Sequence, residues 1–371
     1  MTGGRQSKIL WLAAFIALET GFPPLLGQEE TGSSAAAEIA ISAPVGILRL
    51  PEGTPAHIPA PRLPAAAQAG AGSSFAVTYL AEGVPDNSPY GSSTCTAWTD
   101  PAKAAFQFAT ATWAPLINSG VPIRINACLA NLGSSPFLNY AWISAGKNTP
   151  NVPLLDTWYP SALVNSLAGY NFVSGSQDIY ITINNSVSWY FGTDGNTPSG
   201  KYDLVTVSMQ SIFSGLYGSI TMTYGKSSCG DDTWGCWGQG LSRSPGVYDR
   251  FTENSLGQKL LNTSLFPNPS AQLGAQLTGG NLYFNGPNAN AANGGARVKI
   301  YAPAPWVDGA SYSTLDYNTF KSTPNEFGIF GLGTGTSIHD PGPVVLGLLK
   351  DIGWPSVVIQ THRVSLPLIR R

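Results

Sequence analysis

The chain has 371 residues, of which 43% are hydrophobic and only 11% are charged, and its formal net charge is −2. This length and apolar content allow a large buried core. The small net charge provides no basic field that would hold nucleic acid or an anionic membrane. We therefore expect neither nucleic acid nor a membrane as a partner.

The first 27 residues have the layout of a secretory signal peptide. Arg5 and Lys8 precede an apolar run over residues 9–18, and small and turn-forming residues follow up to Gly27. An uncleaved membrane anchor is the alternative, but this run is much shorter than the roughly 20 residues that span a bilayer. The pattern predicts export, so that the protein would be secreted, periplasmic or located at the cell surface.

Residues 28–72 are rich in Ala, Pro, Gly and Ser. Such a composition buries too little apolar surface to offset the entropy that is lost on ordering. We interpret this stretch as a linker or a propeptide-like leader. The folded domain is then predicted over residues 73–356, with a C-terminal tail at 357–371.

Strands and helices are predicted to alternate in the first part of the domain. Asp100 is the expected N-cap of the first helix, and Pro101 its first helical residue. The strand predicted at 178–184 alternates between apolar and polar residues, which predicts one buried face. The predicted elements are strands at 75–80, 121–129 and 178–184 and helices at 101–117 and 154–167.

A further helix is predicted from Asp203, as N-cap, to Gly218, as its stop. Burial in the core explains its apolar pattern. The apolar residues recur at spacings of three and four: Leu204, Val205, Met209, Ile212, Phe213 and Leu216.

Gln210, Ser211 and Ser214 have the spacing of a zinc-peptidase motif without its chemistry. In that motif two His at i and i+4 leave one helix face, and a Glu beside the first deprotonates the metal-bound water. Amide and hydroxyl side chains supply neither a basic nitrogen nor a carboxylate. We therefore predict no zinc cofactor and no catalytic residue at these positions.

The chain is loop-rich from this helix to about Lys299 and ends in a predicted helix that Asp340 caps and Gly353 terminates. Together these elements predict an α+β fold. An N-terminal mixed sheet would pack on helices, and an irregular C-terminal subdomain would end in the last helix.

Four cysteines form an even set, which is typical of an oxidising compartment. We predict disulfides between Cys95 and Cys128 and between Cys229 and Cys236. The second pair is separated by a short Gly- and Asp-rich loop that closes easily. The alternative is four free thiols in a cytosolic protein.

Several segments, in one order from Phe75 to Trp354, resemble the secreted bacterial zinc metallopeptidases of the metzincin type, which are related in layout to leishmanolysin. The resemblance implies a metzincin-like domain. The segments are DTWYPSALVNSLAG (156–169), WYFGTDGNTPSGKYDLVTV (189–207), YDRF (248–251), SYSTLD (311–316), TPNEF (323–327) and IHDPGPVVLGLLKDIGW (338–354).

The resemblance also locates the positions that this chain has lost. Such enzymes continue the KYD tract with His-Glu-x-x-His, where this sequence has Gln210-Ser211-Ile212-Phe213-Ser214. Their third zinc ligand would correspond to Thr314, and their Met-containing turn to Phe327-Gly328-Ile329-Phe330. The family pattern therefore implies an inactive protease homologue.

The chain contains three histidines, and only His339 lies within the predicted domain; His57 is in the leader and His362 in the tail. A three-His zinc site would need leader and tail to fold into one pocket, which we consider improbable. We expect His339 to orient the Asp340 cap. It is also the one candidate for a residual general base.

Two acidic loops could bind calcium, but each has a simpler role in a turn. The Asp194-Gly195-Asn196 loop and the Asp231-Asp232 pair could hold structural calcium, but neither follows the EF-hand pattern, and turn roles are favoured.

A peptidase cleft can receive its substrate as an added strand. We expect such an edge near residues 178–184, with a protein, peptide or glycan as the unknown partner.

These observations lead to two hypotheses. The first is an exported pseudoprotease without zinc or catalytic Glu that acts as a binding or scaffold protein. The second is a secreted hydrolase that uses another site in the same cleft, with His339 or a pair of carboxylates. The second hypothesis requires His339 to face the cleft near Gln210.

Overall fold

The computed structural model describes residues 36–41, 45–50, 56–61, 72–86, 93–218, 220–355 and 357–358. The predicted signal peptide and residues 359–371 of the predicted tail lie outside this range. Val358 donates its backbone N–H to the carbonyl of Leu116, so the domain extends slightly beyond its predicted end at residue 356.

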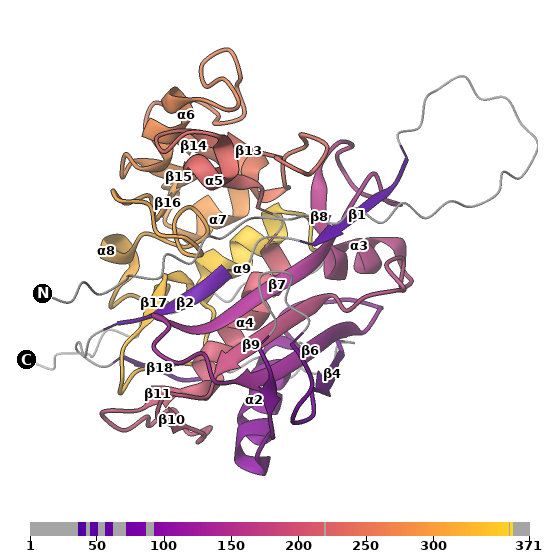
Figure 1. The fold of residues 1–371 in the computed structure, drawn as a ribbon, viewed down its shortest axis with the longest axis vertical. Coiled ribbons are helices and arrows are strands. Elements are labelled where there is room, and N and C mark those ends of the chain that lie inside the picture. Colours follow the sequence, from indigo (N-terminus) through magenta and orange to yellow (C-terminus); the bar gives the residue numbers. More distant parts are fainter. Residues whose placement is uncertain are drawn as a thin grey trace, which may run out of the picture.

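A mixed nine-stranded sheet forms the centre of the molecule (Figure 1). Its main order is β17-β2-β7-β9-β6-β4, with β1 and β8 paired to β7 and β5 paired to β6. The strands β4, β6 and β9 are parallel, whereas β7 is antiparallel to β9. The strands are β1 (Glu38–Ile41), β2 (Val45–Arg49), β4 (Phe75–Tyr79), β5 (Cys95–Thr96), β6 (Ile123–Ala130), β7 (Phe137–Lys147), β8 (Trp158–Pro160), β9 (Ile179–Asn184) and β17 (Gly331–Leu332).

The helices α2 (Asp100–Trp113) and α4 (Leu204–Tyr217) pack against this sheet and against each other. Their apolar residues share one core cluster with those of β6 and β9. The N-cap of α2 is Thr99, not Asp100 as predicted, because the Thr99 hydroxyl accepts from the N–H of Ala102. The predicted helix at 154–167 is shorter and later than expected, since α3 (Ser161–Ala168) begins only after Pro160.

Strand β9 confirms the strand predicted at 178–184 but corrects its environment. It lies between β6 and β7 and is therefore hydrogen-bonded along both edges. Every residue except the half-buried Tyr180 is buried. The predicted single buried face is wrong, and this strand offers no edge for an added peptide.

The leader prediction for residues 28–72 is wrong for three segments. Strands β1 and β2 both pair antiparallel with β7, and β3 (His57–Ile58) pairs with β18 (Ser337–Ile338). The Ala- and Pro-rich composition concealed short β-branched and aliphatic stretches, which gain stability from an existing sheet edge and need no core of their own. The folded domain therefore begins well before residue 73.

The chain after α4 forms small sheets and short helices, as the sequence predicts for an irregular C-terminal part (Figure 1). Pro341 is the N-cap residue of the last helix, while the Asp340 carboxylate accepts from the N–H of Gly342. The elements are β10 (Trp189–Tyr190), β11 (Tyr202–Asp203), β12 (Met222–Tyr224), α5 (Lys226–Cys229), β13 (Gly235–Trp237), η1 (Tyr248–Phe251), β14 (Thr252–Asn254), α6 (Ala271–Leu277), β15 (Leu282–Phe284), α7 (Pro287–Ala292), β16 (Val298–Ile300), α8 (Tyr317–Phe320), η2 (Glu326–Gly328) and α9 (Gly342–Asp351).

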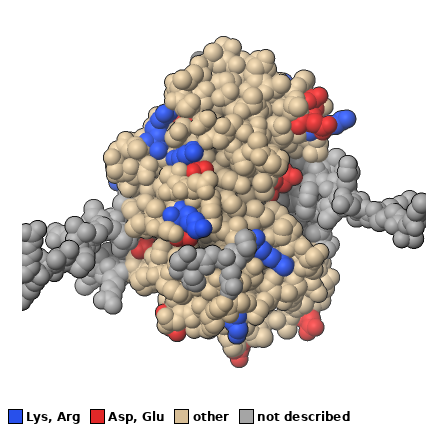
Figure 2. Space-filling view, turned by 90° about the vertical axis from the view of Figure 1, so that its left-hand side faces the viewer, with Lys and Arg blue, Asp and Glu red and all other residues tan. Residues whose placement is uncertain are grey.

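Both predicted disulfides are present, Cys95–Cys128 and Cys229–Cys236. The first joins β5 to β6, and the second links α5 to β13. Uncharged residues dominate the face shown in Figure 2, and acidic and basic side chains are scattered over it. Within the described ranges, no helix is both long and apolar enough to cross a bilayer.

Candidate functional site on helix α4

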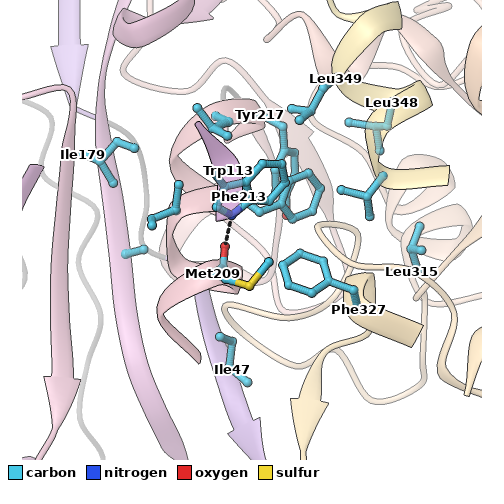
Figure 3. Packing of buried hydrophobic residues seen from close by; sticks show 14 of the residues in the cluster. Ile47, Trp113, Ile179, Met209, Phe213, Tyr217, Leu315, Phe327, Leu348 and Leu349 are labelled. Carbon is cyan, nitrogen blue, oxygen red and sulfur yellow. Dashed lines mark hydrogen bonds between the residues drawn. The ribbon is translucent and has the colours of Figure 1, made fainter. Parts of the chain in front are cut away.

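Helix α4 has the predicted ends but is buried on all sides. Asp203 is its N-cap, accepting from the N–H of Thr206, and Gly218 follows its last residue. Every residue from Leu204 to Tyr217 is buried, and none of them is charged. The expected burial of its apolar residues is confirmed, and its polar residues are buried as well, because the sheet and α2 cover one side of the helix while the C-terminal part covers the other (Figure 3).

Aromatic side chains fill the side of α4 that faces the C-terminal part (Figure 3). The Trp113 and Phe213 rings are stacked with centroids 6.2 Å apart, and Phe327 lies within 6.1 Å of both. The indole N–H of Trp113 donates to the carbonyl of Met209 at 3.0 Å. Well-packed rings therefore occupy the space beside the helix.

The three side chains at the motif positions bond to atoms of the protein itself. Gln210, Ser211 and Ser214 are 4%, 0% and 8% exposed. The Gln210 amide donates to the carbonyl of Phe327 at 2.7 Å. The hydroxyls of Ser211 and Ser214 donate back along the helix, Ser211 to Val207 at 2.7 Å and Ser214 to Gln210 at 3.1 Å.

The segments that were matched to the third ligand and the turn lie against the same helix. Phe327, in the predicted turn, bonds Gln210, and the Tyr217 hydroxyl donates to the carbonyl of Ser313, next to Thr314. The Thr314 hydroxyl itself donates to the carbonyl of Ala310 at 3.0 Å. Burial raises the pKa of Tyr217 above its usual range, which keeps its hydroxyl protonated as the donor. The structure thus brings these segments together around α4, with Thr314 bonded locally.

His339 does not orient Asp340 as predicted, because its partner is Asp203. The His339 Nε2 atom lies 2.8 Å from Asp203 Oδ2, and the imidazole is only 1% exposed. The same carboxylate oxygen accepts from the backbone N–H of Thr206 and so caps α4. His339 therefore fixes the start of α4, two turns before Gln210, and does not face an open site.

His57 belongs to the fold, although the sequence placed it in a leader. Its Nδ1 atom lies 2.9 Å from the carbonyl of Gly195 and 3.2 Å from the Ser337 hydroxyl. His362 is outside the described residues. In the part of the chain that the structure describes, no three His, Cys, Asp or Glu side chains are grouped so that they could hold a metal ion.

The two proposed calcium loops use their carboxylates in turns. Asp194 accepts from the Tyr190 hydroxyl at 2.7 Å and from the N–H of Asn196, and these bonds lower the pKa of Asp194 to about 2. Asp231 accepts from the N–H and the hydroxyl of Thr233. These contacts support the turn roles, and structural calcium stays a prediction.

Asn139 is a site residue that the sequence analysis missed. This fully buried side chain in β7 donates to the Ser211 hydroxyl at 2.7 Å, and its Oδ1 atom accepts from the N–H of Ile47 in β2 at 3.0 Å. It therefore connects the helix to the N-terminal segment. A lone amide within the strand FLNYAWISAG could have signalled such a polar contact.

No protein-family model, curated protein or solved structure matches the chain. The geometry on α4 therefore carries the argument about function. A helix that holds Gln210, Ser211 and Ser214 in bonds to backbone and amide groups can support a structure, but it offers neither a metal ligand set nor an exposed base.

Proposed function

We propose that this protein is an exported pseudoprotease, a metzincin-like domain without zinc ligands or catalytic Glu that acts as a binding or scaffold protein. One observation carries the proposal: Gln210, Ser211 and Ser214 are buried and bonded within the protein. The assembly of the Ser313–Thr314 and Phe327 segments around the same helix supports descent from a peptidase layout. Both disulfides support an oxidising compartment.

The chemistry of hydrolysis is missing from these positions. Attack on a peptide bond needs an activated water or a nucleophile next to a base. Ser211 has its hydroxyl committed to Val207 and Asn139, and the Ser214 hydroxyl donates to a backbone carbonyl. Neither hydroxyl has a basic partner.

The alternative hydrolase gains no support from His339. This residue would have to face a cleft near Gln210, but its imidazole is enclosed in the core between Asp203 and the ring of Phe108, whose centroid is 5.7 Å away. A positioning role at the start of α4 accounts for these contacts.

Metal analysis and a cleavage assay on the purified full chain test the proposal. We expect less than stoichiometric zinc after dialysis against zinc and no chelator-sensitive cleavage of a broad peptide library. Zinc bound at one equivalent together with chelator-sensitive cleavage would refute it.

A variant with the motif restored serves as the matched control. The triple change Gln210→His, Ser211→Glu and Ser214→His supplies two ligands and the base while Thr314 stays in the third position. We expect it to remain inactive, and to become detectably zinc-binding only when Thr314→His is added. The four-fold variant thus shows whether the metal analysis registers a zinc ligand set at these positions.

A further inference from the structure

A polar pocket lies on the face of the central sheet that is turned away from α4. Ile179 of β9 packs against this helix, since a Cβ atom on Gly215 would meet its side chain. The next residue, Tyr180, therefore points to the opposite face. The pocket beside Tyr180 has a volume of about 410 Å³, which is within the usual range of small-molecule sites. Its lining residues are Ile41, Arg124, Asn126, Tyr180 and residues 174–177.

Two polar atoms of this lining are buried and have no hydrogen-bond partner among the described residues. They are Arg124 Nε, which is a donor, and Asn126 Oδ1, which is an acceptor. Arg124 and Asn126 are two residues apart on β6, so their side chains leave the same face of the sheet. Buried polar atoms in folded proteins nearly always have a partner. Hydroxyl groups would satisfy both atoms, because a hydroxyl donates as well as accepts.

The charge of Arg124, the one charged side chain in the lining, is already balanced. Its Nη2 atom lies 3.4 Å from Oδ1 of Asp178, whose side chain is fully buried. The same nitrogen donates to the carbonyl of Val173 at 2.9 Å. An anion such as sulfate would gain little from a paired guanidinium, and its oxygens would leave Asn126 Oδ1 without a donor. The lining thus favours a neutral ligand with hydroxyl groups.

Tyr180 supplies a fixed aromatic surface in the pocket. Its ring is stacked on that of Trp142 in β7, with centroids 5.7 Å apart and planes 2° apart. Its hydroxyl accepts from the N–H of Gln177 at 3.1 Å. Asn126, Tyr180 and Trp142 are paired across the neighbouring strands β6, β9 and β7, so they form one row on this face (Figure 1). The face of an aromatic ring is partly negative and attracts the partly positive C–H groups of a sugar.

We infer that this pocket binds a neutral saccharide, whose hydroxyls accept from Arg124 Nε and donate to Asn126 Oδ1 while its C–H groups contact Tyr180. A sugar ring carries hydroxyl and C–H groups side by side, which matches the donor, the acceptor and the ring in the lining. The inference goes beyond the proposed function, because it names a second site on the other face of the sheet from α4.

Saturation-transfer NMR on the purified full chain tests the inference. The probes are the methyl glycosides of glucose, galactose, mannose and N-acetylglucosamine, each titrated separately. We expect at least one of them to receive saturation from the protein. Arg124→Lys keeps a positive charge beside Asp178 but removes the Nε donor, and Asn126→Ala removes the acceptor. Each change should raise the Kd of that sugar at least about tenfold, because a polar group of the ligand loses its partner.

Thr78→Ala is the matched control. Thr78 is exposed on β4 and is the direct neighbour of Asn126 in the sheet, but it is not among the described residues that line the pocket. This change should leave the Kd of the sugar unaltered. Circular dichroism and urea unfolding establish that each variant is folded. Should Arg124→Lys fail to fold, Asn126→Ala and sulfate competition decide the result.

Sulfate, added to the sugar complex, tests the ligand class, and we expect it not to displace the sugar. Three results would overturn the inference: no saturation of any of the four glycosides, equal sugar binding by wild type and Asn126→Ala, or displacement of the sugar by sulfate. Zinc content and peptide cleavage, which test the proposed loss of catalysis, do not enter this result.

Discussion

Replacing Asp203 with Ala tests whether the Asp203–His339 pair is structural. The fully buried carboxylate accepts from the N–H of Thr206 at 2.8 Å, the Thr206 hydroxyl at 2.6 Å and the Thr197 hydroxyl at 3.1 Å, and it contacts His339. Loss of an N-cap costs about 1 kcal/mol, and each buried group left without a partner costs about 1–3 kcal/mol. We therefore expect the free energy of unfolding to fall by about 3–5 kcal/mol.

Urea unfolding followed by circular dichroism measures this loss. Thr99→Ala is the matched control, because Thr99 caps α2 at an exposed site and should cost about 0.5–1 kcal/mol. Asp203→Asn, which can still cap the helix, should lie between the two. If Asp203→Ala costs no more than Thr99→Ala, the reasoning about the buried pair is wrong. A double-mutant cycle with His339→Ala should show coupling above about 1 kcal/mol.

Two more variants test packing and charge. Gly215→Ala places a methyl group against the side chain of Ile179 and should lower the unfolding free energy by about 1–3 kcal/mol, whereas Gly175→Ala, which meets open space, should stay within about 0.5 kcal/mol in the same urea titration. Burial raises the pKa of Glu253, but hydrogen bonds from Asn285, Arg297 and Lys259 outweigh it and lower the pKa overall. The stabilisation from Glu253 is thus complete above its unfolded pKa and is lost as the pH falls through the folded value. Glu253→Gln should therefore be less stable than wild type at pH 7, and the difference should shrink in unfolding experiments at acidic pH; a gap that does not change with pH would contradict the assignment.

The sequence predicted what depends on local chemistry. The ends of α4 followed from Asp203 and Gly218, because capping is a property of a few neighbouring residues. Both cysteine pairs were predicted correctly, and so was the strand over residues 178–184. The α+β character followed from the alternation of strand and helix patterns.

Features that depend on distant partners were missed. The strands β1 and β2 were interpreted as a leader, since their stability comes from the edge of β7 and not from their own composition. His339 was assigned to its sequence neighbour Asp340, whereas its partner Asp203 is 136 residues away. A sequence pattern does not show which of two acids will be adjacent after folding.

The sequence singles out the residues of the candidate site but not their surroundings. The identity of Gln210, Ser211 and Ser214 leads to the prediction that the usual zinc ligands are absent from these positions. The segments that cover the polar face of the helix cannot be identified from the helix's own residues, because they come from distant parts of the sequence. Phe327 and Asn139 provide that face with partners instead.

The contacts of α4 with both ends of the chain affect the order of folding. The helix lies near the middle of the sequence, yet Ile47 packs beside it, and the indole N–H of Trp354 donates to the carbonyl of Leu216 at 3.0 Å. The helix cannot be fully covered until Trp354 has left the ribosome, and contacts between distant residues slow folding. We expect the native burial of α4 to be completed only after Trp354 has been synthesised.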